Sequence, residues 1–360
     1  MITIIHIGLI KTGTTALQEF LSNNRATLLA RGYCYSSAAG SLQHLALTAC
    51  AQDEHVFDPV RIVCGLNDAC DVPAFRNRIE SALKAEALAS PAHTLILSDE
   101  HMSYALVRKS EVERLRNIVQ SFSERVQVIV YLRRQDDLRE SWYSTMIKTG
   151  AEFKLDLPDE YEIETRYNFR ALIMLWASVF GHENIKVRRY DRQKLLNGNI
   201  VDDFLDVVGL GQMEGTTSAA VNTSLDACTT EFLRIFNQYV PRIVDQKLCP
   251  SRGDIVGMLE TISSKSSPRT RLTTSQRQRL MCHVKSSNAW VADHFFEGAR
   301  ADGDPLFGPD YVSVEPDPIP FTAEEAVYVA AEIWKRIGSF WRQDQAHGWR
   351  DHSGKRVDPL

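Results

Sequence analysis

The sequence has no large excess of charge of either sign and no long apolar run. Its formal net charge is −5 over 360 residues. We therefore do not expect a general nucleic-acid-binding protein, because such a protein needs a surface excess of Lys and Arg. No stretch approaches the roughly 18 apolar residues that a membrane-spanning helix requires, and the N-terminus lacks the basic and apolar regions of a signal peptide. These absences predict a cytoplasmic protein.

Cysteines are scattered and odd in number, with seven in the chain and no C-x-x-C pair. This usage is typical of reduced thiols rather than of a disulfide framework. A zinc site built from Cys64, Cys70 and either His44 or His55 has poor ligand spacing, so we expect no metal.

Hydrophobic residues make up 44% of the chain and charged residues 24%, which is typical of an ordinary globular protein. The length allows one large α/β domain with insertions, or two domains. We find no internal repeat and no low-complexity tract. Bulk composition alone indicates no particular function.

The most specific pattern stands at the N-terminus. Residues 2–7 form a β-branched run that predicts a buried strand, a tight Gly- and Thr-rich turn follows, and residues 14–21 predict a helix. Such a junction directs free backbone N–H groups and the positive end of the helix dipole at one place, which favours anion binding. Additional donors come from the Lys11 ammonium group and from the hydroxyls of Thr12, Thr14 and Thr15. The alternative is a tight turn whose threonines only cap the helix.

This loop differs from a Walker A motif. Gly8 and Gly13 have the spacing of G-x-x-x-x-G-K-[ST], but Thr14 follows Gly13 and Lys11 lies two positions before it. The order Lys-Thr-Gly-Thr-Thr resembles the loop of sulfotransferases that use 3′-phosphoadenosine 5′-phosphosulfate (PAPS). In that family the loop binds the 5′-phosphosulfate.

Strands and helices then alternate along the first 210 residues. Continuous apolar runs predict buried strands at 94–98, 126–132 and 185–190, and a short strand is expected at 33–35. Helices are expected between them, including one at 110–122 capped by Ser110 with Glu113. The alternation predicts an α/β fold with a doubly wound, mostly parallel sheet.

Beyond residue 210 the strand pattern fades. Helices are expected near 225–244, 274–296 and 323–342. We therefore divide the chain into an α/β core over residues 1–210 and a mostly helical region over residues 211–360. The second region is either a cap on the sheet or an acceptor-binding lobe.

A second motif follows the strand at 126–132. Arg133, Asp137 and Ser141 form an R-x-x-x-D-x-x-x-S element, in which the arginine ends a strand and the serine lies two turns along the next helix. The two side chains are suited to hold a second anion. The alternative is that Arg133 forms an ion pair with Asp136 or Asp137 and that the serine is a surface residue. Both motifs together resemble PAPS-dependent sulfotransferases over roughly residues 1–210, with most likeness to the bacterial and carbohydrate-type members.

This resemblance implies a P-loop-type sheet and transfer of a sulfuryl group from PAPS to an acceptor hydroxyl, without a metal. The implied donor-binding residues are Lys11, Thr12, Gly13, Thr14, Thr15, Ala16, Arg133, Ser141 and Tyr190. Tyr190 corresponds to a tyrosine near the adenine, although an ordinary core tyrosine fits the pattern as well. The implied acceptor is a carbohydrate or glycoconjugate, and a small aromatic or natural-product hydroxyl is the alternative.

The reaction needs a group that stabilises the leaving oxygen and a base that removes the hydroxyl proton. Lys11 is the candidate for the first role. For the base we favour Glu100, then His101, which directly follow the strand at 94–98, and His44 is third. The family's Arg-Lys-Gly segment is missing here. Basic stretches at 252–253 and 265–271 are the candidate substitutes, and the favoured alternative is that they form a solvated loop.

Two other functions fit the sequence less well. Residues 95–100 resemble a Walker B strand that ends in Asp-Glu, which would suit a P-loop kinase or NTPase. A nucleotide-binding protein without turnover is the second alternative. Acceptor identity is left open, since the segments at 53–73 and 151–167 either bind it or only pack, and oligomeric state is left open too.

Overall fold

The computed structural model describes residues 1–56, 58–214, 225–240, 243–244, 247–248, 250–263, 269–296, 304–308 and 321–347. Contacts divide the chain into two compact units. The first comprises Met1–Leu138, Pro158–Val221 and Arg277–Val312, and the second comprises Arg139–Leu157, Asn222–Gln276 and Ser313–Leu360. This partition differs from a single division at residue 210, because residues 139–157 belong to the second unit and residues 277–312 to the first.

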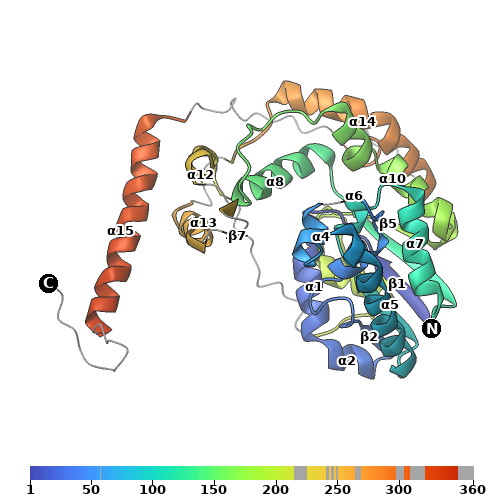
Figure 1. Cartoon of the computed structure of the whole chain (residues 1–360). Coiled ribbons are helices and arrows are strands. Elements are labelled where there is room, and N and C mark those ends of the chain that lie inside the picture. Colours follow the sequence, from blue (N-terminus) through green and yellow to red (C-terminus); the bar gives the residue numbers. More distant parts are fainter. Residues whose placement is uncertain are drawn as a thin grey trace. The chain divides into compact units, whose positions relative to one another are not determined.

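The first unit is built on a sheet of five parallel strands (Figure 1). These are β1 (Ile2–His6), β2 (Tyr33–Tyr35), β3 (Thr94–Ser98), β4 (Arg125–Leu132) and β5 (Ile185–Arg189). Their order is β2-β3-β1-β4-β5, and Ile4 of β1 is in register with Ile96 of β3 and Gln127 of β4. The predicted parallel α/β sheet is therefore confirmed.

Helices cover both faces of this sheet, which explains why β3, most of β1 and the second half of β4 are buried. One face packs against α1 (Thr14–Asn23), α2 (Arg25–Ala30) and α11 (Ile200–Val207). Ile4, Ile96 and Ile129 supply its strand residues. The connections between strands on the other side are α3 (Leu45–Ala51), α5 (Val72–Ala89), α7 (Lys109–Gln120) and α10 (Phe169–Phe180), and α7 and α10 both contact β4.

Shorter elements complete the first unit. They are α4 (Pro59–Val63), η1 (Ala69–Asp71), α6 (Met102–Ala105), α9 (Glu160–Glu162), the π-helical turn η2 (Ile163–Tyr167), η3 (His182–Asn184) and η4 (Leu196–Gly198). α14 (Thr274–Phe295) lies mostly in this unit, and α8 (Gln135–Lys148) begins in it. The predicted cap of α7 is wrong, because the N-cap residue is Arg108 and its backbone N–H donates to Glu111.

Most of the described residues of the second unit are helical, and they include a short antiparallel pair, β6 (Ile243–Val244) and β7 (Lys247–Leu248). Its helices are the later part of α8, α12 (Ala227–Tyr239), α13 (Pro250–Ile262) and α15 (Ala323–His347). Buried side chains from α8, α12, α13 and α15 form one apolar core, which contains Tyr143, Ile147, Leu233, Leu259 and Val329. The sequence pattern did not predict α13.

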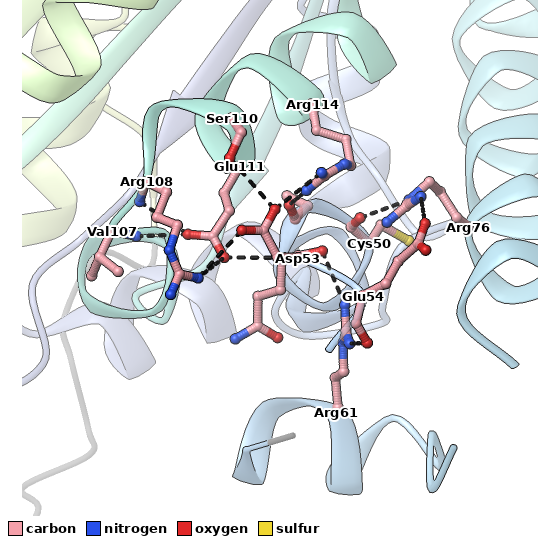
Figure 2. A network of polar contacts seen from close by, with 12 residues as sticks. Cys50, Asp53, Glu54, Arg61, Arg76, Val107, Arg108, Ser110, Glu111 and Arg114 are labelled. Carbon is pink, nitrogen blue, oxygen red and sulfur yellow. Dashed lines mark hydrogen bonds and ion pairs between the residues drawn. The ribbon is translucent and has the colours of Figure 1, made fainter. Parts of the chain in front are cut away.

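The irregular segment between α3 and α5 is fixed by buried polar contacts (Figure 2). Arg61 is fully buried and donates to the backbone carbonyls of Gln52, Glu54 and Val56 over 2.6–2.9 Å. Asp53 accepts from Arg114 on α7 over 3.1 Å. This segment is therefore held in place near the end of β3, to which α3 is also bonded through His44.

Candidate functional site

The candidate site lies where β1, β3 and β4 end. In an open parallel sheet, ligands bind beyond the carboxyl ends of the strands, at the point where successive connections leave in opposite directions. β1 continues toward β2 and β4 continues toward β5, so this point lies between β1 and β4. The loop after β1, Asp99 to His101 after β3 and Arg133 after β4 all stand at this edge.

The loop after β1 has the backbone of an anion-binding turn. Gly8, Lys11 and Gly13 all have positive φ, at 54°, 66° and 76°. A Cβ on Gly13 would lie 3.1 Å from the Tyr190 hydroxyl oxygen, so this turn requires glycine for both conformation and space. Alternation of left- and right-handed residues directs successive N–H groups into one concave surface, which suits an anion.

α1 begins directly at this loop. Gly13 is its N-cap residue, no side chain caps it, and the described first turn carries no acidic residue. The first backbone N–H groups of a helix have no partner within the helix, and those of Thr14, Thr15 and Ala16 occupy these positions. The predicted anion site therefore has suitable donors and no competing carboxylate in the first turn of its own helix.

The threonines of the loop differ in what their hydroxyls do. Thr12 is buried, and its Oγ1 donates to the Leu9 carbonyl over 2.7 Å, so this hydroxyl supports the loop itself. Thr14 is also buried, whereas Thr15 is half-buried in the first turn. The Thr12 hydroxyl thus supports the loop without capping the helix, and a contact of Thr12 with a ligand stays a prediction.

Arg133 joins the loop after β4 to the loop after β1. Its Nη1 donates to the Lys11 carbonyl oxygen over 2.8 Å, and its guanidinium carbon lies 6.0 Å from the centre of the Tyr190 ring. Tyr190 follows β5 and also borders Gly13. The fold therefore brings Arg133 and Tyr190 next to Lys11 and Gly13, from which they are distant in the sequence.

Ser141 lies on the part of α8 that belongs to the second unit. Its pairing with Arg133 stays a prediction. Close to Arg133, Asp136 is buried and accepts from Arg134 over 3.0 Å and from Arg277 over 3.1 Å. Burial, and then the charge of Asp136, raise the pKa of Asp137. These ion pairs fix the start of α8 behind Arg133.

Glu100 contacts α1 at the edge of the loop. Its Oε2 accepts from Gln18 Nε2 over 3.1 Å, and a Cβ on Gly8 would lie 3.0 Å from the Glu100 Cβ. Burial, and then the charge of Asp99, raise the pKa of Glu100 against the opposing effects of His101, Thr14 and Gln18. A carboxyl group with a raised pKa beside an anion loop is suited to proton transfer.

His101 is held by Asp99. The His101 Nδ1–H donates to Asp99 Oδ1 over 2.7 Å, and the backbone N–H of His101 donates to the same oxygen over 3.3 Å. Asp99 is fully buried, and its other oxygen accepts from the Thr48 hydroxyl on α3. Burial lowers the pKa of His101, but the hydrogen bond and charge of Asp99 outweigh it, so the pKa is raised.

His44 is the least suited of the three base candidates. It is fully buried, its Nε2 lies 2.9 Å from the Ser36 carbonyl oxygen, and its Nδ1 accepts from the Ser98 backbone N–H over 2.7 Å. Both ring nitrogens thus connect α3 to β2 and β3. Burial also lowers its pKa, so His44 serves to hold these elements.

A small pocket opens between the loop and the end of β3. Its lining residues are Leu9, Ile10, Ser103, Tyr104, Leu138, Arg166 and Tyr167. The Tyr104 ring lies 5.5 Å from the His101 ring, centre to centre. The sequence reading missed Asp99, Thr48 and Gln18 as site residues; only the position of Asp99 at a strand end signalled it.

Within the described residues, no group of three His, Cys, Asp or Glu side chains is arranged to hold a metal ion. Nor does any described helix have both the length and the apolar character needed to cross a bilayer.

Comparisons with known proteins find similarity in sequence and in structure. No family model matches the chain. Over 173 residues it is 25% identical to a protein of Archaeoglobus fulgidus named only as uncharacterized, which covers 47% of this chain and 45% of that protein. The chain therefore matches less than half the length of this curated relative. A crystal structure of a sulfotransferase from Alicyclobacillus acidocaldarius superposes with a TM-score of 0.42 and 11% identity, covering 81% of this chain and 94% of that one.

Proposed function

We propose that this chain is a sulfotransferase that moves the sulfuryl group of PAPS to an acceptor hydroxyl. The observation that carries the proposal is the hydrogen bond from Arg133 to the Lys11 carbonyl. This bond supports the proposal because it joins the loop after β1 to the loop after β4 at the switch point of the sheet, and a donor with separate 5′- and 3′-phosphate groups would need anion sites on both loops.

In the proposed reaction the acceptor oxygen attacks sulfur in line with the bond to the 5′-phosphate. A new S–O bond forms, the bond from sulfur to the phosphate oxygen breaks, and the acceptor proton passes to a base. The products are a sulfate ester and 3′,5′-bisphosphoadenosine (PAP). Negative charge grows on the leaving phosphate oxygen, so cationic and N–H donors at that oxygen lower the barrier.

Each residue of the site has a proposed part. Lys11 stabilises the leaving oxygen, and the N–H groups at Gly13 to Ala16 hold the phosphosulfate. Arg133, with Ser141, holds the 3′-phosphate, and Tyr190 contacts the adenine. The proton acceptor comes from the segment after β3, where Glu100 and His101 both have raised pKa values.

The proposed acceptor is a carbohydrate hydroxyl, on the resemblance given above, with a small aromatic alcohol as the alternative. A P-loop kinase is the rival activity, and its magnesium-binding aspartate would have to be Asp99. That carboxylate is buried and bonded to Thr48 and His101, which does not favour a metal ligand.

Transfer can be tested directly with donor labelled in the sulfuryl group and EDTA present. The chain is incubated with labelled PAPS and separate carbohydrate and phenol mixtures, and labelled products are separated by chromatography. We expect label in one acceptor class and release of PAP. Transfer of phosphate from ATP with magnesium, and none of sulfate from PAPS, would establish the kinase instead.

A further inference from the structure

We propose that Asp99 and His101 act as an acid–base pair, in which His101 Nε2 receives the acceptor proton and Asp99 is the positioning residue. This proposal rests on the proposed function, to which it adds the base that receives the acceptor proton. It assigns Glu100, the neighbouring carboxyl group, to the support of the loop instead of to proton transfer.

The first argument is the hydrogen bond between the pair. Because Asp99 Oδ1 accepts from His101 Nδ1–H over 2.7 Å, the neutral imidazole carries its proton on Nδ1. Its Nε2 then has the lone pair that a base needs. The His101 side chain is 23% exposed while Asp99 is 0% exposed, so only the histidine is within reach of an acceptor.

The second argument is how firmly Asp99 is held. Thr48 on α3 donates to one carboxylate oxygen, while the His101 backbone N–H and imidazole donate to the other. A buried carboxylate with three donors keeps a fixed orientation, and it therefore fixes both the rotamer and the tautomer of the imidazole.

The third argument is position. Tyr104 contacts the His101 ring and lines the small pocket whose other side is formed by Leu9 and Ile10 of the anion loop. Through its contact with Tyr104, His101 is therefore close to the wall of a small pocket that the anion loop also borders. Glu100, in contrast, accepts a hydrogen bond from Gln18 of α1.

Several charged groups act on this imidazole. Asp99 and Glu100 at the end of β3 and Asp58 at the start of α4 favour its protonated form, whereas burial opposes it. From the η2 side, Arg166 lies over the Tyr104 ring, with its guanidinium carbon 5.2 Å from the ring centre. Asp99 is the one of these groups that contacts the imidazole through a hydrogen bond in the described structure.

The first measurement requires no activity. NMR titration of the histidine ring signals, with the His101 signal assigned by its loss in His101→Gln, gives the pKa of His101 directly. We expect a value above the ordinary 6.5, which falls by about one unit or more in Asp99→Asn. Thr48→Val removes a donor but keeps the carboxylate charge, so the pKa should stay raised. An ordinary pKa in the natural chain, or no fall in Asp99→Asn, would overturn the pair.

The second measurement is the pH profile of sulfuryl transfer from PAPS to water, followed as PAP release. The rate should rise with pH through the pKa of His101. Asp99→Asn should shift this limb to lower pH and reduce kcat about 10- to 100-fold, with KM for PAPS unchanged. If the rise of the rate with pH disappears in Glu100→Gln but is unchanged in Asp99→Asn, Glu100 is the base and the proposed pair is wrong. If PAP does not bind, the proposed function is wrong, but the NMR titration still measures the pKa of His101 and still tests the pair.

Discussion

The Arg133 guanidinium donates a hydrogen bond to the Lys11 carbonyl oxygen, and the two residues are 122 positions apart in the sequence. Lys11 has a positive φ of 66°, so this bond stabilises a backbone conformation that a lysine rarely adopts. A guanidinium has five N–H donors, and this bond is therefore compatible with a second, bidentate contact to a phosphate. In the proposed function, one arginine thus connects the shape of the first loop to the binding of the donor.

Arg133→Ala should weaken PAP binding about 10- to 100-fold, because charge-assisted hydrogen bonds contribute about 1.5–3 kcal/mol. Arg133→Lys should recover only part of the affinity, since an ammonium group cannot make the forked contact. Isothermal titration calorimetry measures both. The matched control is Arg125→Ala at the opposite end of β4, an exposed residue that should leave affinity unchanged. Equal losses in both alanine variants would contradict the assignment of Arg133.

Gly13→Ala should lower the free energy of unfolding by about 1–2 kcal/mol, because a left-handed conformation is costly for a residue with a Cβ. The added Cβ also meets Ile200 and Tyr190 at 3.1 Å, so PAP binding should weaken too. Urea unfolding measures the stability. As a control, Gly257→Ala within α13, where a Cβ meets nothing within 4 Å, should stabilise the chain by about 0.5–1 kcal/mol. Unchanged stability in Gly13→Ala would refute the strained turn.

Stability should fall as the pH is lowered from about 6.5 to about 4. His6 is fully buried between Tyr131 and Phe204, and burial lowers its pKa to about 4, against the opposing charge of Asp99. The unfolded chain therefore binds this proton at a higher pH than the folded chain. The resulting loss is about 3 kcal/mol, complete near pH 4.

The test of this effect is denaturant unfolding at a series of pH values in the natural chain and in His6→Asn. Asparagine keeps a polar atom toward Ser98, which bonds to His6 Nδ1 over 2.8 Å, but it does not titrate. The variant should lose stability less steeply between pH 6.5 and 4. Parallel slopes for the two chains would show that His6 is not responsible.

Arg61→Lys should destabilise the first unit by about 2–3 kcal/mol, because one ammonium group cannot satisfy three carbonyls that the guanidinium bonds in a buried site. Thermal or urea unfolding gives the difference. The control is Arg78→Lys on α5, which is exposed and should change stability by no more than about 0.5 kcal/mol. A similar result for the two variants would mean that these backbone contacts do not fix the segment before α5.

The sequence predicts the sheet well, because β1, β3 and β4 contain continuous apolar runs and each run ends at a polar or Gly-rich junction. β1, β3, β4 and β5 all fall within about one residue of the expected ranges. The residue pattern predicts a helix over residues 41–51, but α3 begins only at Leu45 and has His44 as its N-cap. Local patterns identify elements reliably but locate their ends less well.

Contacts through space are what the sequence could not predict. Asp99 and Glu100 are adjacent acidic residues with nothing in the chain to distinguish them, yet one faces α3 and the other faces α1 because side chains alternate at a strand end. From the sequence alone Arg61 would be expected at the surface, whereas in the fold it is buried and bonded to three backbone carbonyls. The basic stretch proposed at 265–271 begins outside the described residues, and its role stays a prediction.

The most direct test of the account is calorimetric titration of the chain with PAP and with ATP, both in EDTA. If the loop after β1 and Arg133 form one donor site, PAP should bind with a Kd in the micromolar range or below. ATP, which has no 3′-phosphate, should bind about 10- to 100-fold more weakly. Tighter binding of ATP than of PAP, or PAP binding that Arg133→Ala leaves unchanged, would contradict it.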